Sequence, residues 1–477
     1  MTTAVHHKII FLTGALLLLI ATATAAYLAE PWWLLVPVGC AIITALILHP
    51  NLLIDVLLFT IPWSAEFQFS SGFGTDLPDE PLMLLMAFSA IFLLILRRHQ
   101  WFTRSLHPLL ILLLVQFLWL AVSVAFSTHF LLSVKYFLAK SWYLLAFVAA
   151  PLLLWQSKAS IKRSFAVLSV SMLLVTSATL VRHAATGFTF STIDHALEPF
   201  FRNHVNYSAL LVFMVPLQVL FWQEAKTKTL KRIWLCSFFI TLPALYFSFA
   251  RGAWLAAFAG LAAYWLLKRK WLLRGFLFAV LVVTSFVFWL RSDDRYLQFA
   301  HDYKTTIFHQ NFEEHWTATY ELKDMSTAER FYRWVAGVRM IEDSWQTGFG
   351  PTTFYQHYKS YTVPAFKTWV SKNEEQSTVH NYFLLLIIEQ GALGLLLFLA
   401  LLGLLAWYAQ KVYHQTTDVF WKRIVAAMAV ILAMQCTLNF LSDLIETDKV
   451  GTIFYLSIAA LIIADKKTTQ QFNDQSK

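Results

Sequence analysis

Long apolar stretches separated by short polar connections make up most of this chain. A stretch of about 17 to 25 apolar residues is long enough for a helix to cross the hydrocarbon of a bilayer. The pattern predicts an all-α, polytopic membrane bundle of about fourteen spans, or of about twelve spans with re-entrant pieces, because segment 51–64 is short. The predicted spans are 8–28, 32–48, 51–64, 80–96, 107–126, 131–155, 161–182, 204–222, 231–249, 252–267, 272–290, 380–409, 421–441 and 449–464.

One polar segment is much longer than the other connections. It covers residues 291–379 and separates the N-terminal membrane helices of 1–290 from the C-terminal membrane helices and short tail of 380–477. Within it, Ser326 to Ile341 predicts an amphipathic helix, because the serine is followed three residues later by a glutamate and then by apolar residues at helical spacing. This segment is large enough to fold over a site.

Composition and charge agree with this class of protein. Hydrophobic residues make up 58% of the chain, charged residues 14%, and the mean hydropathy is +0.58, which excludes a set of soluble domains. The net charge of +9 comes from basic residues on alternate connections. By the positive-inside rule those connections and both termini are cytoplasmic. In 291–379 the charges nearly balance, so the sequence predicts no nucleic-acid partner.

The short cytoplasmic loops limit the possible chemistry. They are far smaller than a nucleotide-binding domain, and the chain has no Walker A sequence. The three cysteines, Cys40, Cys236 and Cys436, each lie in an apolar run, which predicts buried thiols rather than a disulfide framework or a zinc site. We therefore expect a site on the external side, with no metal and no cofactor.

His380 lies where the long polar segment meets the next apolar run. An imidazole has an ordinary pKa of about 6.5, and the positive end of a helix dipole favours its neutral, proton-accepting form. This position suits a general base, with Asn381 beside it as a substrate-binding residue. The alternative is a capping or interfacial histidine.

Two further clusters fall on the same side. Arg251 precedes Gly252 at a predicted helix start, where a guanidinium and exposed backbone N–H groups suit a phosphate or diphosphate; the alternative is an arginine that snorkels to the surface. Arg202 and Asn206 open the span 204–222 and are candidate ligands, with His204 as a rival base.

Charged residues near other span ends are weaker candidates. Lys135 and Lys140 lie within the span 131–155, where an ammonium without a partner is costly, so both are candidate charges lining an outward-facing cavity. Asp443, Glu446 and Asp448 form an acidic turn that supplies either counter-ions and acceptor-binding groups or a solvated loop.

These features together resemble the O-antigen ligase and polymerase superfamily, bacterial membrane glycosyltransferases that use polyprenyl-diphosphate-linked glycans. The family more often has Ser where this chain has Ala250. The residues that carry the resemblance are Phe249–Leu255, Arg330, Trp345–Phe354, His380, Asn381, Glu389, Gly391 and Gly394.

The resemblance implies a reaction and a place for it. The donor would be an undecaprenyl-diphosphate-linked glycan, the acceptor a glycolipid or glycan, and the protein a multi-pass protein of the bacterial inner membrane with its active site facing the periplasm. Arg251, assisted by Arg202 or Arg330, would neutralise the leaving diphosphate. His380 would deprotonate the acceptor hydroxyl, and attack opposite the leaving group would invert the anomeric configuration.

Several functions stay open at this point. An O-antigen ligase of lipopolysaccharide assembly, an O-antigen or exopolysaccharide polymerase, and a protein O-oligosaccharyltransferase would share the same donor chemistry. A lipid-linked glycan flippase or transporter would also be polytopic, but such proteins tend to place coupling groups near the bilayer midplane and to show internal repeats.

Overall fold

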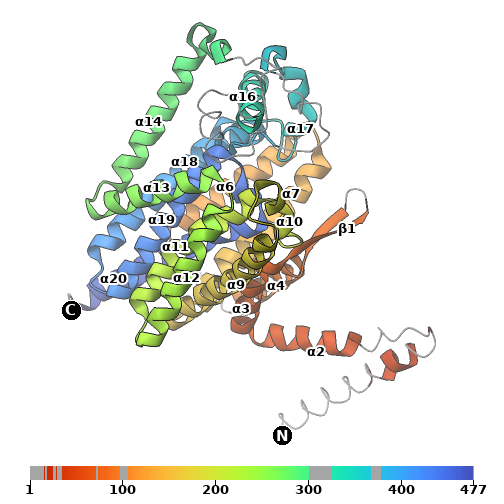
Figure 1. Cartoon of the computed structure of the whole chain (residues 1–477), viewed down its shortest axis with the longest axis vertical. Coiled ribbons are helices and arrows are strands. Elements are labelled where there is room, and N and C mark those ends of the chain that lie inside the picture. The colour runs from red at the N-terminus through yellow and green to blue at the C-terminus, as the bar shows by residue number, and fades with distance from the viewer. Residues whose placement is uncertain are drawn as a thin grey trace.

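The computed structural model describes residues 16, 19–24, 28, 35–70, 73–96, 106–299, 325–366 and 378–475. Helices dominate these residues and pack side by side in a bundle, with α16 and α17 of the external segment gathered at one end of it (Figure 1). The predicted helical bundle is confirmed for this part of the chain.

Eight of the described helices are long and apolar enough to cross a membrane. They are α4 (Asp79–Leu96), α6 (Pro108–Ala125), α7 with its continuation α8 (Phe130–Leu154), α9 (Lys158–Ala185), α11 (His204–Glu224), α14 (Leu272–Arg291), α18 (Tyr382–Gln415) and α19 (Val419–Leu441). Within Phe130–Leu154, a π-helical turn, Leu145–Ala149, joins α7 to α8.

Other helices occupy predicted spans without meeting the same length and hydropathy. They are α2 (Leu35–Leu48), α3 (Pro50–Thr60), α12 (Lys228–Tyr246), α13 (Arg251–Lys268) and α20 (Asp448–Gln475). The predicted membrane bundle is therefore confirmed, but the count of about fourteen spans is not. The predicted span 8–28 falls largely outside the described residues.

Shorter helices lie in the connections. They are η2 (Ile61–Trp63), η4 (Phe190–Thr192), α10 (Ile193–Leu197), η5 (Ser292–Phe299), α17 (Phe354–His357), η6 (Tyr358–Tyr361), η7 (Pro364–Phe366) and η9 (Leu444–Glu446).

A β-hairpin departs from the all-α prediction. Strands β1 (Ala65–Ser70) and β2 (Phe73–Leu77) pair antiparallel, with Ala65 opposite Leu77. Polar and apolar residues alternate along β1, which is the period of a strand. The alternation covers only six residues, too few to register in a search for membrane-length apolar runs.

Ion pairs gather the basic connections at one end of the bundle. Lys158 binds Asp418, and Arg423 binds Glu224 with its Nη1 2.6 Å from the carboxylate Oε1. These pairs join the connections before α9, after α11 and before α19. The grouping is the one that the positive-inside rule requires, and the orientation relative to the membrane stays a prediction.

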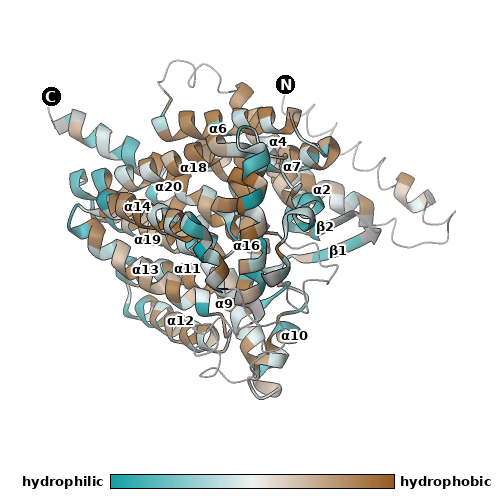
Figure 2. Cartoon of the chain, turned by 90° about the horizontal axis from the view of Figure 1, so that it is seen from above, coloured by the Kyte–Doolittle hydropathy of each residue, from teal (hydrophilic) through white to brown (hydrophobic). Residues whose placement is uncertain are grey.

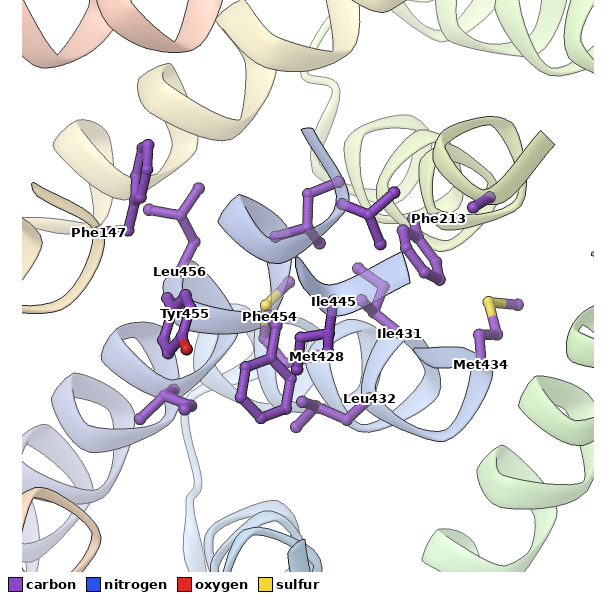
Figure 3. Close-up of a cluster of buried hydrophobic side chains, with 14 of the residues drawn as sticks. Phe147, Phe213, Met428, Ile431, Leu432, Met434, Ile445, Phe454, Tyr455 and Leu456 are labelled. Atoms are coloured by element: carbon purple, nitrogen blue, oxygen red, sulfur yellow. The ribbon is translucent and has the colours of Figure 1, made fainter. Parts of the chain in front are cut away.

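The core of the bundle is built around α19 and α20. Residues 450–465 of α20 are all buried, as expected for a helix surrounded by others. Phe213 of α11, Ile431 of α19 and Phe454 of α20 belong to one apolar cluster (Figure 3). Helix α13 approaches α19 closely because its facing residues are small: a Cβ at Gly260 would lie 2.5 Å from Met434 Cε.

The amphipathic helix predicted in the external segment is present as α16 (Met325–Ser344). Seen from above, it carries both hydrophilic and hydrophobic stretches (Figure 2). Helical spacing predicts an apolar stripe of Phe331, Trp334, Val335, Val338 and Ile341. The most buried face is rotated from this stripe, since Val335 and Ala336 are buried while Trp334 and Val338 are only half-buried. The reason is packing against α18, where a Cβ at Gly337 would lie 2.8 Å from Ile388 Cδ1.

Helix α18 is broken near its external end. Gly391 has φ 72° and ψ −178°, a conformation that is essentially restricted to glycine. A Cβ at Gly391 would collide with the carbonyl of Gln346. The break therefore divides α18 into a short half-helix, 382–390, and a long membrane helix, 392–415.

A turn of the external segment fills this break. Phe349 N donates to Ile388 O over 2.9 Å, and Gly350 N donates to Glu389 O over 3.0 Å. In return, Ala392 N donates to Trp345 O over 2.7 Å. Because a buried backbone group without a partner is costly, these bonds make the break tolerable within a membrane bundle.

The Glu389 side chain completes this clasp, by which we mean the contacts between residues 345–354 and 388–392. Its carboxylate accepts hydrogen bonds from Thr352 N at 2.8 Å and Phe354 N at 3.1 Å. Trp119 Nε1 of α6 donates to Gln390 O at 2.8 Å. The half-helix that follows His380 is thus held from both sides.

We expect Gly391→Ala to destabilise the protein more than Gly187→Ala. Gly187 also has a positive φ, 78°, but has no neighbour within 4 Å of an added Cβ, so its substitution introduces strain without a collision. Strain alone is of order 1–3 kcal/mol. Thermal unfolding of the purified protein in detergent measures the difference, and equal losses in the two variants would contradict the clasp.

Candidate active site

His380 sits at the outer end of the half-helix, in backbone geometry that fixes its direction. It has φ 54°, which is uncommon for a residue other than glycine. Its N–H donates to Thr378 Oγ1 at 3.3 Å, and the next residue, Asn381, caps α18 by accepting from Leu384 N at 3.0 Å. Asn381, predicted to bind substrate, is thus placed as a helix cap.

Two arginines of α16 place positive charge beside His380. Burial, together with the Arg330 and Arg333 guanidiniums, lowers the pKa of His380 to about 3. Arg333 is held by Thr378 O, 2.9 Å from its Nη1, and by Glu329 Oε1, 3.2 Å from its Nε. At neutral pH the imidazole is therefore neutral and able to accept a proton, but its low pKa makes it a weak base.

Arg251 is the first residue of α13, where the N-cap residue, Ala250, makes no side-chain capping bond. A Cβ on the next residue, Gly252, would lie 3.3 Å from Leu441 at the end of α19. On the other side of the same turn, Tyr382 N donates to Ser442 O at 3.2 Å. The structure thus places Arg251 and the His380 segment around the outer end of α19.

Acidic residues follow directly after this turn. Asp443 is half-buried, and desolvation raises the pKa of its carboxyl group, although a hydrogen bond from the Thr378 hydroxyl opposes the shift. Glu446 Oε2 lies 2.9 Å from Lys140 Nζ, and Glu446 Oε1 accepts from Tyr136 at 2.9 Å. The acidic turn is therefore packed into the site and is not a solvated loop.

The two candidate lysines have different surroundings. Lys140 is buried, paired with Glu446, and within 5.3–5.8 Å of the ring centres of three tyrosines. It lines a small pocket of about 40 Å³ that Tyr382 and Gln390 of the half-helix also line. Lys135 is exposed. The prediction of a cavity-lining lysine fits Lys140, but its charge is already matched by a carboxylate.

Arg202 and Asn206 lie toward the β-hairpin. Arg202 is exposed and pairs with Glu66 of β1, 3.7 Å from Nη2 to Oε2. Asn206 lies in the first turn of α11, which Asn203 caps. Arg202 is thus paired with the hairpin, whereas the guanidiniums that lower the pKa of His380 are Arg330 and Arg333.

One acidic group has the spacing of a metal site. Asp76, Asp79 and Asp448 each offer a carboxylate oxygen within 4.8 Å of the others. The ammonium of Lys449 interacts with all three and also donates to Ser64 O at 2.8 Å. That ammonium supplies the positive charge that a cation would bring, so we assign no metal to this group.

Sequence reasoning missed Arg333 as a member of the site. Arg330 and Arg333 are three residues apart in the predicted amphipathic helix, a spacing that puts them on one face. That spacing was the available signal. The spacing alone does not single out Arg333, because positive and negative charges nearly balance in 291–379, and such a segment is typical of a solvated surface.

Comparison with known proteins bears on the same residues. The sequence profile of the O-antigen ligase family matches residues 236–399. A search of curated proteins found no significant match to this chain. The matched segment runs from α12 to the long part of α18 and includes Arg251, Arg330, His380, Asn381 and Glu389, whereas Lys135, Lys140, Arg202 and Asn206 lie outside it. Within residues 236–399, about a third of its length, the chain is similar to the O-antigen ligase family.

Proposed function

We propose that this protein is an inverting glycosyltransferase that moves a glycan from undecaprenyl diphosphate to an acceptor sugar hydroxyl, as an O-antigen ligase does. The observation that carries the proposal is the position of His380 near the Arg330 and Arg333 guanidiniums, just before a broken helix within the family-matched segment. The arrangement supplies a proton acceptor and a place for a leaving anion.

The reaction balances with these groups. The acceptor oxygen attacks the anomeric carbon from the face opposite the diphosphate, and a new C–O bond forms while the bond to the diphosphate oxygen breaks. The diphosphate leaves with the electron pair, and its growing charge is met by Arg251 and Arg330. The acceptor proton passes to the neutral ring of His380. No metal and no cofactor is part of this scheme.

Donor binding would also switch on the base. The same guanidiniums that keep the pKa of His380 low would be neutralised by an incoming diphosphate. The imidazole pKa would then move up toward its ordinary value, so that His380 becomes a stronger base once the donor is in place. The guanidiniums near His380 would thus bind the diphosphate and would also keep His380 a weak base until the donor is bound.

The location and acceptor follow from the same proposal. The site would face the periplasm of the bacterial inner membrane, with both termini cytoplasmic, because the basic connections lie at the other end of the bundle. A glycolipid acceptor makes the protein a ligase in lipopolysaccharide assembly. A second lipid-linked glycan would make it a polymerase, and a protein hydroxyl would make it an oligosaccharyltransferase.

A transport function is the second candidate, because broken helices are common in transporters. In those proteins the unwound carbonyls coordinate the transported ion. Here the carbonyls at the break are bonded to residues of the clasp and to Trp119. This difference favours the glycosyltransferase.

We expect His380→Ala to lower kcat for transfer by about 10²–10⁴, the usual contribution of a general base. Arg251→Ala should lower it by about 10²–10³ because transition-state charge loses a partner. The measurement uses purified protein, a synthetic undecaprenyl diphosphate glycan and candidate acceptors. Arg202→Ala is the comparison, since Arg202 pairs with the hairpin. Wild-type rates in either of the first two variants would remove the corresponding role.

The pH dependence of kcat/KM tests the environment of His380. With a pKa of about 3 in the substrate-free protein, His380 should cause no loss of activity between about pH 8 and 5. In Arg330→Gln the pKa should rise toward its ordinary value, so protonation should lower activity at higher pH than in the wild type. Arg330→Lys keeps the charge and should keep the wild-type profile. A loss near pH 6.5 in all three proteins would contradict this account.

A further inference from the structure

Buried polar atoms without partners occur on several of the described helices, and some of them belong to side chains near the outer end of the bundle. Gln435 and Asn439 of α19 are 0% and 1% exposed, and neither their amide nitrogens nor their oxygens have a hydrogen-bond partner among the described residues. Asn206 Oδ1 of α11 and Trp254 Nε1 of α13 also have no hydrogen-bond partner among the described residues. Such atoms are rare in folded proteins, and each calls for an explanation.

These side chains lie at one level of three neighbouring helices. Asn206 and Trp254 belong to the first turns of α11 and α13, and Asn439 lies in the last turn of α19. Gln435 is one turn deeper on the same face, about 6 Å along the axis. Helices α11 and α13 pack against α19 and against each other.

A fifth side chain, on the external segment, lies near the end of α19. The Trp334 ring of α16 lies 5.9 Å from the ring of Phe440, the residue next to Asn439. Its Nε1 also has no partner among the described residues. Five side chains from four helices therefore bring unused hydrogen-bonding capacity to one region.

Elsewhere in the bundle, the buried amide of Gln218 uses its nitrogen, although its Oε1 has no partner among the described residues. The Nε2 atom of Gln218 donates to Ser237 Oγ at 2.9 Å and to Thr241 Oγ1 at 2.7 Å. Apolar side chains of the same size at 435 and 439 would avoid the cost of burying amides. The side-chain amides of Gln435 and Asn439 therefore make no hydrogen bond that would stabilise the fold. Binding to a ligand would explain why they are there.

The chemistry of the group defines that ligand. Amides donate and accept hydrogen bonds, and indoles donate one bond while offering a flat apolar face. None of the five side chains carries a charge. This combination suits a neutral ring bearing hydroxyl groups and does not suit a phosphate.

We propose that Gln435, Asn439, Trp254, Trp334 and Asn206 form a subsite for the sugar ring attached to the donor diphosphate. This rests on the proposed function, in which the diphosphate is held by Arg251, one helical turn before Trp254. The subsite selects donors by the hydroxyl pattern of their first sugar.

The test compares Asn439→Leu and Gln435→Met with the wild type. Each variant should lower kcat/KM for a synthetic undecaprenyl diphosphate glycan by at least about tenfold, because hydrogen bonds to sugar hydroxyls are lost. Tm should stay the same or rise, because a buried amide without a partner is removed. Gln218→Met is the matched control, and it should lower Tm without changing the preference among donors.

A second readout does not depend on catalysis. The oligosaccharide released from the diphosphate should raise the Tm of the wild type and not that of Asn439→Leu. Wild-type transfer and an unchanged ligand effect in both variants would overturn the subsite while leaving the proposed function in place. A parallel loss of Tm and activity would also overturn it. A wild type that binds the oligosaccharide but transfers nothing would overturn only the proposed function.

Discussion

The rest of the site depends on the hydrogen bonds that fill the break in α18. A helix interrupted inside an apolar bundle exposes backbone groups that lipid cannot satisfy. Residues 345–354 supply the missing partners, and Glu389 binds the same turn through its side chain. Because these bonds fix the half-helix, they also fix the residues directly before it, which include His380. The external segment is thus a structural part of the membrane bundle.

The charged groups around His380 determine which kind of substrate suits the site. The outer end of the bundle collects guanidiniums from α13 and α16, and one of them, Arg333, pairs with Glu329. An anionic substrate at His380 would add a further negative partner for these guanidiniums. The pairing of Lys140 with Glu446 shows the opposite case, a buried charge whose partner belongs to the protein itself.

The sequence predicts features that depend on neighbouring residues, but it does not predict contacts between residues far apart in the chain. The apolar helices and α16 follow from periodicity, which is a local property. The hairpin was missed because its alternation is short, and the buried face of α16 was misplaced because Gly337 packs against α18, a contact that no local pattern records. The positions of Arg251 and His380 around α19, and the link between Gln346 and Gly391, join residues far apart in the chain. Gly348 and Gly350 indicate a turn near Gln346, but they do not indicate that this turn packs against Gly391.

The clasp also closes the chain between Phe349 and Ile388 into a loop whose two ends are tied together. The entropy needed to join the ends of such a loop grows only slowly with its length. A change in the length of this loop therefore costs little entropy, provided that the tied ends and His380, which lies inside the loop near Ile388, are kept. In the proposed transferase, such a change would alter which acceptors reach the site while the clasp stays the same.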